Sequence, residues 1–198
     1  MTELRMLCWR GPEPQRIDSA HVSLGTDFLR AHGTSLTASY ALDYRLETEP
    51  GWVTSELDVG SRGDGWWRSL VLRRSGGEWS ADWAGEGLGA LPARLPDLEG
   101  ALDCDLGLCP LTNTMPVLRH DLVGASHRGA GGSHDLVMAW VSVPDLTVRR
   151  SDQRYAVSDP IDEGGALVVY GSEDFRTTIE FDADGLVVNY PGLGRRVE

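Results

Sequence analysis

Two aspartates and an arginine within a short stretch have the side chains needed for acid–base chemistry. Asp103 and Asp105 are two residues apart, so both point to one face if the segment is extended, and Arg119 follows shortly after them. A carboxylate pair of this kind can serve a hydrolase or isomerase that acts on a small substrate. The same residues can instead form an ion pair that only stabilises the fold, because arginine binds carboxylates bidentately. We expect a structural pair between Asp105 and Arg119, with carboxylate pKa values lowered by the arginine.

The other reactive side chains match no catalytic or metal-binding pattern. Ser126 precedes His127 without the glycine pattern of a nucleophile elbow. The sequence has no lysine, which excludes Schiff-base chemistry and the phosphate-loop lysine. The available metal ligands have spacings unlike those of short zinc motifs, so we expect no metal and no cofactor. These ligands are Cys104, Cys109, His120, His127 and His134.

Aromatic and basic side chains offer a binding function instead. Trp66 and Trp67 are adjacent, so a strand would send one ring to each face, where it could pack in the core, line an apolar groove or stack on a sugar. Several arginines could meet a phosphate or carboxylate headgroup, or could simply be solvated. They are Arg149, Arg150, Arg154, Arg195 and Arg196.

Four segments of the sequence share a pattern with a known family. They are Asp103–Leu106, Cys109–Arg119, Asp152–Tyr155 and Asp184–Arg196. Together they resemble the glycolipid-binding family of bacterial proteins, whose name gives a ligand class and no reaction. The resemblance implies an open, half-barrel-like β roll that binds an amphipathic lipid or glycolipid. The residues that we expect to bind it are Trp66, Trp67, Asp105, Asn113, Arg119, Arg154, Tyr155 and Tyr190.

Alternation of apolar and polar residues predicts the strands that carry these side chains. The pattern is clearest from Leu36 to Glu47, which we expect to be one long strand. Further strands are expected at 53–59, 66–73, 78–83, 136–143, 146–155, 166–170, 175–181 and 186–190. The strand 136–143 is apolar on both faces and is expected to be central. Residues 84–100, the proline-containing stretch 109–119 and the glycine-rich stretch 125–133 are expected to be irregular.

Eight to ten short strands with little helix predict an antiparallel β roll or open half-barrel. We expect residues 1–198 to form a single domain that contains two sub-sheets.

The net charge of −12 disfavours nucleic acids and anionic membrane surfaces as partners. The sequence has no apolar run long enough for stable membrane insertion or for a secretory signal, and its three cysteines are an odd, sparse set. We therefore expect a cytoplasmic monomer with free thiols that binds an amphipathic lipid and catalyses no reaction. The alternatives are an enzyme that uses Asp103, Asp105 and Arg119, or a protein-interaction module without a ligand.

Overall fold

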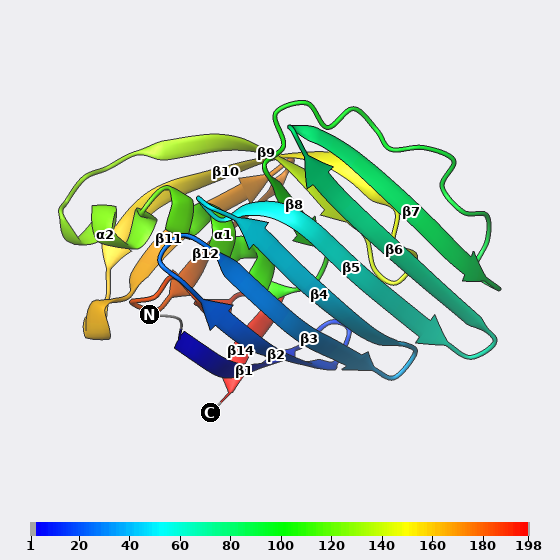
Figure 1. Cartoon of the computed structure of the whole chain (residues 1–198). Helices are drawn as coiled ribbons and strands as arrows, with labels where there is room; N and C mark the ends of the chain where they lie inside the picture. Colours follow the sequence, from blue (N-terminus) through cyan, green and yellow to red (C-terminus); the bar gives the residue numbers. More distant parts are fainter. Residues whose placement is uncertain (1–2, 198) are drawn as a thin grey trace.

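The chain folds into one continuous β-sheet of fourteen strands, against which short helices pack (Figure 1). The computed structural model describes residues 3–197. Strands make up 58% of the chain and helices 10%, which confirms a mainly β fold with little helix. The strands are β1 (Glu3–Gly11), β2 (Arg16–Leu24), β3 (Leu29–Thr37), β4 (Ala41–Glu49), β5 (Val53–Gly63), β6 (Trp66–Ser75), β7 (Glu78–Glu86), β8 (Asp103–Leu106), β9 (Ser133–Val141), β10 (Val148–Pro160), β11 (Ala166–Ser172), β12 (Phe175–Phe181), β13 (Val187–Tyr190) and β14 (Gly194–Val197). The helices are η1 (Pro110–Asn113), α1 (Thr114–Arg119), α2 (Leu122–His127) and η2 (Asp162–Gly164).

Two antiparallel meanders share this sheet. Strands β1 to β7 pair in sequence order, and so do β9 to β13. Strand β14 pairs with both β13 and β1, and it thereby joins the two expected sub-sheets into one. Strand β8 runs parallel to β9 at one edge, and β7 forms the other edge of a sheet that is not closed into a barrel. The predicted open antiparallel roll is confirmed.

The predicted number of strands was too low, because β1, β2, β8, β14 and most of β3 were missed. Strand β2 has weak alternation, since two of its buried positions hold Arg16 and Asp18, which pair with each other at 2.9 Å. The expected long strand Leu36–Glu47 was also wrong. It is divided between β3 and β4 by a turn at 38–40, where the Thr37 hydroxyl accepts hydrogen bonds from the backbone N–H groups of Ser39 and Tyr40.

The stretch 109–119 forms helices rather than the expected irregular connection. Cys109 is extended, as expected before a proline, and Pro110 begins η1. Met115 was expected to be extended but is helical, with Pro116 as the third residue of α1. The first four backbone N–H groups of a helix have no partner within the helix, so a proline there removes no hydrogen bond.

The expected loop 125–133 is shorter, because α2 continues to His127 and β9 begins at Ser133. Burial of Leu122 holds α2 against the sheet. Strand β9 was expected to be central, but it is second from the edge of the sheet. Its apolar residues Met138 and Ala139 are nevertheless both buried.

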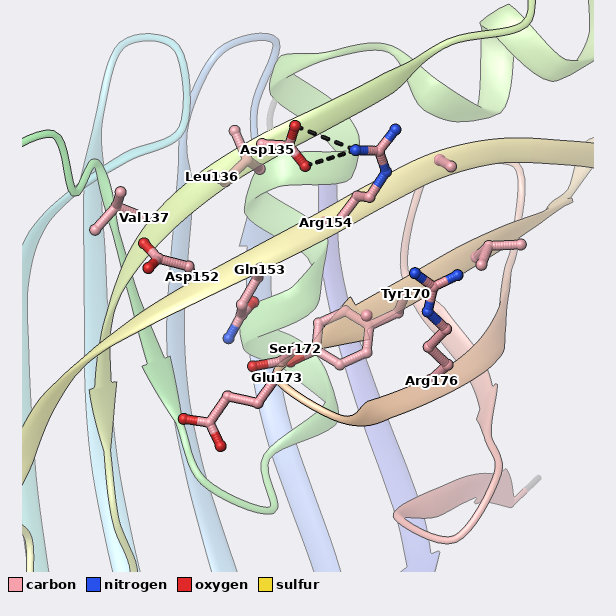
Figure 2. Close-up of a pocket in the computed structure, with 13 residues that line it drawn as sticks. Asp135, Leu136, Val137, Asp152, Gln153, Arg154, Tyr170, Ser172, Glu173 and Arg176 are labelled. Atoms are coloured by element: carbon pink, nitrogen blue, oxygen red, sulfur yellow. Dashed lines mark hydrogen bonds and ion pairs between the residues drawn. The ribbon is translucent and has the colours of Figure 1, made fainter.

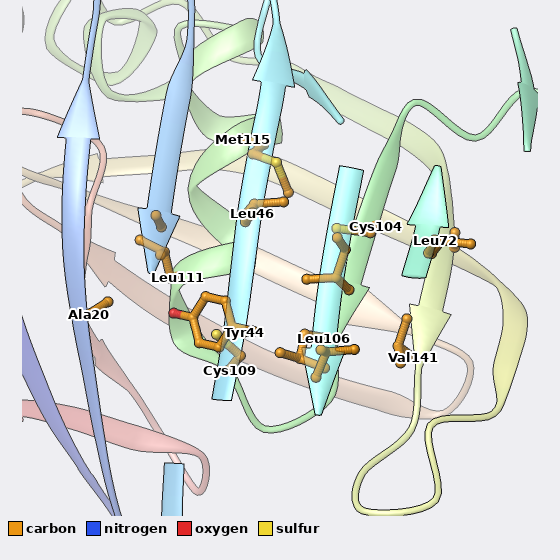
Figure 3. Close-up of a cluster of buried hydrophobic side chains, with 14 of the residues drawn as sticks. Ala20, Tyr44, Leu46, Leu72, Cys104, Leu106, Cys109, Leu111, Met115 and Val141 are labelled. Atoms are coloured by element: carbon orange, nitrogen blue, oxygen red, sulfur yellow. The ribbon is translucent and has the colours of Figure 1, made fainter. Parts of the chain in front are cut away.

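Two clusters of buried side chains form the core. The first contains residues of β1 to β6 together with Cys104, Leu106, Cys109 and Leu111 (Figure 3). The second lies under β10 to β13 and includes Tyr155, Val168 and Phe181. Helix α1 contributes Met115 to the first cluster and Val117 to the second. It therefore packs against both halves of the curved sheet.

The tryptophans of β6 lie on opposite faces, as predicted. Trp66 packs against the first core cluster, whereas Trp67 is 45% exposed. The stretch 84–100 was expected to be irregular, but its first three residues belong to β7, which continues to Glu86. From residue 87 through Gly100 the chain is irregular, as expected. Among residues 3–197, no helix has the length and apolar character that a membrane crossing requires.

Candidate functional site

Strand β8 brings the two aspartates to the boundary between the core clusters. Cys104 and Leu106 belong to the first cluster, so the alternation of the strand turns Asp103 and Asp105 the other way. Asp103 forms a bidentate ion pair with Arg119, at 2.9 Å between Oδ1 and Nη1. Their side chains are only 2% and 13% exposed. Burial raises the pKa of Asp103, and the ion pair offsets only part of that effect.

Asp105 does not pair with Arg119, so the expected partner was wrong. Its carboxylate accepts hydrogen bonds from the Thr112 hydroxyl at 2.9 Å and from the Gln153 amide at 2.7 Å. Burial raises its pKa, the two hydrogen bonds lower it, and the nearby Asp103 charge raises it further. The expected lowering of the pKa by an arginine was therefore wrong for both acids, because desolvation is the larger effect.

A chain of buried polar groups extends from Asp105 into the second core. The Tyr155 hydroxyl donates to Asn113 Oδ1 at 2.9 Å and lies 3.2 Å from Gln153 Oε1. The Asn113 amide in turn donates to the carbonyl of Pro110 at 3.3 Å. Because each member has a partner, this network fixes the orientation of the Gln153 side chain.

Gln153 forms part of the lining of a pocket of about 640 Å³, the inner pocket. Tyr170, Phe175 and Tyr190 form an aromatic wall, with ring centroids 5.7 to 6.4 Å apart. Phe175 is 50% exposed, whereas the two tyrosines are buried by their neighbours. The other lining side chains include the charged residues Arg149, Arg150 and Glu173 and the hydroxyls of Ser151 and Ser172. The apolar ones are Leu108, Trp140, Val143, Pro191 and Leu193. The inner pocket thus combines the exposed ring of Phe175 with the partly exposed hydroxyl groups of Ser151 and Ser172.

Arginines hold and border this pocket. Arg16 is buried and donates to the carbonyls of Leu108 and Leu193, at 2.7 and 2.6 Å. It thereby ties together two loops of the pocket wall. Arg149 lines the pocket and lies over the Trp140 ring, with 6.0 Å from its guanidinium carbon to the ring centroid. A cationic side chain and an indole are therefore both available at the rim.

Arg154 lies on the other side of β10 from Gln153, because neighbouring residues of a strand point to opposite faces. It contacts Asp135 at 3.0 and 3.2 Å in a separate hollow of about 430 Å³ (Figure 2). The two hollows adjoin and share Gln153, Tyr170, Ser172 and Glu173. We place the candidate site in the inner pocket, since Arg154 is already neutralised by its own acid.

The structure thus brings together four of the eight residues expected to bind the ligand. Tyr190 lines the inner pocket, and Asp105, Asn113 and Tyr155 form the network behind it. The remaining four, Trp66, Trp67, Arg119 and Arg154, do not line it. Sequence reasoning missed Tyr170 and Phe175 as site residues. The alternation of β11 predicts which face Tyr170 occupies, but the rings converge only in the folded sheet.

The histidines and cysteines considered as metal ligands do not gather into one site. His120 stacks on His134 at 4.0 Å, and His127 contacts the carbonyl of Gly165 at 2.9 Å. Burial, followed by the charges of His134 and Arg119, lowers the pKa of His120 to about 4. Within the range 3–197, no three histidine, cysteine or acidic side chains form a potential metal site. Ser126 donates to the carbonyl of Ser158 at 2.8 Å.

Comparison with known proteins places this chain in a family. A search of curated protein sequences found no match. Among solved structures, the chain is similar to the crystal structure of a DUF1089 family protein from Pseudomonas aeruginosa, at 26% identity and a TM-score of 0.67, over 91% of this chain and 92% of that one. The sequence profile of the family described as "Putative glycolipid-binding" matches residues 6–196. Because this match spans nearly the whole chain, the protein belongs to that family.

Proposed function

We propose that the protein binds a glycolipid or a similar amphipathic lipid, with a sugar headgroup in the inner pocket, and that it catalyses no reaction on it. The observation that carries this proposal is the aromatic wall of Tyr170, Phe175 and Tyr190 beside the partly exposed hydroxyl groups of Ser151 and Ser172. The family description supports the ligand class.

The chemistry of the pocket suits a sugar. The apolar face of a sugar ring packs on an exposed aromatic ring, and its hydroxyl groups need fixed hydrogen-bond partners. Phe175 offers the exposed ring, and Ser151 and Ser172 offer hydroxyl groups in the same pocket. A volume of about 640 Å³ is sufficient for a headgroup of one or two sugar rings.

The buried acids support binding better than catalysis. Asp103 is occupied by Arg119, and Asp105 by Thr112 and Gln153. Neither carboxylate lines the inner pocket, so neither faces a bound substrate directly. The enzyme alternative would require both the ion pair and the Gln153 contact to open.

A titration with alkyl glycosides tests the proposal. Octyl glucoside and dodecyl maltoside, each below its micelle concentration, should bind in calorimetry and raise the melting temperature. Phe175→Ala should weaken binding about two- to tenfold, the range expected for one aromatic contact. Because Phe175 is half exposed, the variant should remain folded.

Trp67→Ala is the matched control, since Trp67 is an exposed aromatic residue outside the inner pocket. Its affinity should equal that of the parent. Equal losses in both variants, or no binding of either glycoside, would contradict the proposal. Release of free sugar during the titration would contradict the absence of catalysis.

A further inference from the structure

A second hollow, lined by residues of β1 to β3, β13 and β14, has the opposite electrostatic character to the rest of the molecule. It measures about 940 Å³ and adjoins the inner pocket at Tyr190 and Gly192, which line both. None of the described residues that line it is acidic, although the chain has 30 acidic residues. We call it the outer groove. Its lining comprises Arg10, Gly11, Pro12, Gln15, Arg16, Ile17, Leu36, Thr37, Asn189, Tyr190, Gly192, Gly194, Arg195 and Val197.

Two arginines face each other in this groove. Arg10 of β1 is the direct cross-strand partner of Arg195 of β14, and both side chains are exposed. Neither forms an ion pair or a side-chain hydrogen bond with any residue in the range 3–197. Like charges directly opposite each other on neighbouring strands destabilise a sheet. An anion placed between them would relieve that repulsion and accept hydrogen bonds from both guanidinium groups.

Exposed apolar side chains continue from this arginine pair. Arg10 is opposite Ile17 on β2, and Ile17 is opposite Leu36 on β3, so the three lie in one row across the sheet. Ile17 is 46% exposed, Leu36 62% and Val197 40%. These are the positions at which an alkyl chain extending from the bound anion would be desolvated.

We propose that the outer groove binds an anionic amphiphile, a carboxylate or phosphate monoester that carries one alkyl chain. Its anionic group lies between Arg10 and Arg195, and its chain lies over Ile17 and Leu36. This site is separate from the sugar site proposed above and does not depend on it. The basic groove also gives an acidic protein one place where an anionic lipid approaches without repulsion.

Calorimetric titration with dodecanoate and with dodecyl phosphate, below their micelle concentrations, tests this inference. Both should bind the parent protein, and added salt should weaken binding. Arg10→Gln and Arg195→Gln should each reduce affinity about tenfold, as expected for the loss of one charge-assisted hydrogen-bonding group. Each variant should melt at or above the parent temperature, because one of two repelling charges is gone. Leu36→Ser should weaken binding without changing its salt dependence.

Arg62→Gln is the matched control, since Arg62 is an exposed arginine outside the groove. It should bind like the parent. Phe175→Ala should also bind dodecanoate normally, so failure of the sugar site is distinguishable from failure of this one. Unchanged affinity in both groove variants, or equal affinity for dodecanol, would overturn the inference. Equal affinity for inorganic phosphate would identify a free anion as the ligand. If the protein binds no amphiphile but self-associates, and Leu36→Ser abolishes that association, the occupant of the groove is a second copy of the chain. Either result overturns the proposal.

Discussion

Replacement of Arg119 by alanine should destabilise the protein by about 3–5 kcal/mol at neutral pH, because it leaves the Asp103 carboxylate buried without its counter-ion. The magnitude follows from burial: the two side chains are 13% and 2% exposed, and the contact is bidentate. For a chain of 198 residues, this loss corresponds to a fall of about 6–20 °C in melting temperature. Urea unfolding followed by tryptophan fluorescence measures the free energy directly.

The effect should depend on pH with a definite sign. Burial already raises the pKa of Asp103, and removal of Arg119 should raise it further. The charged Asp103 carboxylate, which is unfavourable when buried without its partner, is therefore present above the pKa of Asp103 in the folded state. It disappears as pH falls through that pKa. The difference between variant and parent should shrink as pH is lowered from 7 towards 4. The double variant with Asp103→Asn should recover part of the lost stability at pH 7, because it removes the unpaired charge.

Arg62→Ala provides the control for this experiment. Arg62 and Asp43 also form an ion pair, at 3.0 Å, but their side chains are 70% and 51% exposed. An exposed pair contributes about 0–1 kcal/mol, so this variant should unfold almost like the parent. If Arg119→Ala loses no more stability than Arg62→Ala, the reasoning from burial is refuted.

Three further predictions concern burial elsewhere. The pKa of His120 is lowered to about 4, so its contribution to stability is present above pH 6.5 and is lost as pH falls towards 4. The variant His120→Gln should therefore lose less stability than the parent over that pH range. If the melting temperatures of variant and parent fall in parallel with pH, this prediction is wrong. Iodoacetamide should label the partly exposed Cys8 in the native protein but Cys109 only in denaturant, since burial raises the pKa of Cys109 to about 12; early labelling of Cys109 in peptide mass spectrometry would exclude this. Trp9→Ala should cost about 3–5 kcal/mol in urea unfolding because Trp9 is 1% exposed and donates to the Val187 carbonyl, whereas a comparable loss for Trp67→Ala would be unexpected.

The sequence predicted the elements whose signal is local. Alternation within β6 and β12 identifies these strands, because side chains on a strand point to the two faces in turn and one face is apolar. The same rule correctly separated Trp66 from Trp67. Local rules failed at β2, where the inward positions hold Arg16 and Asp18. They also failed at α1, where Pro116 suggested an extended segment. A helix accepts a proline in its first turn, and the sequence alone did not show where the helix begins.

The sequence by itself determined an antiparallel β protein, because alternation, turn residues and family-like segments are properties of neighbouring residues. Only the tertiary structure decided which groups meet. Asp103 pairs with Arg119, whereas Asp105 binds Gln153 from a strand 48 residues away. Likewise, Arg10 meets Arg195 only because β14 returns beside β1. Such contacts depend on how the whole sheet curves and in which order its strands pair, and neither property is encoded in the spacing of residues along the chain.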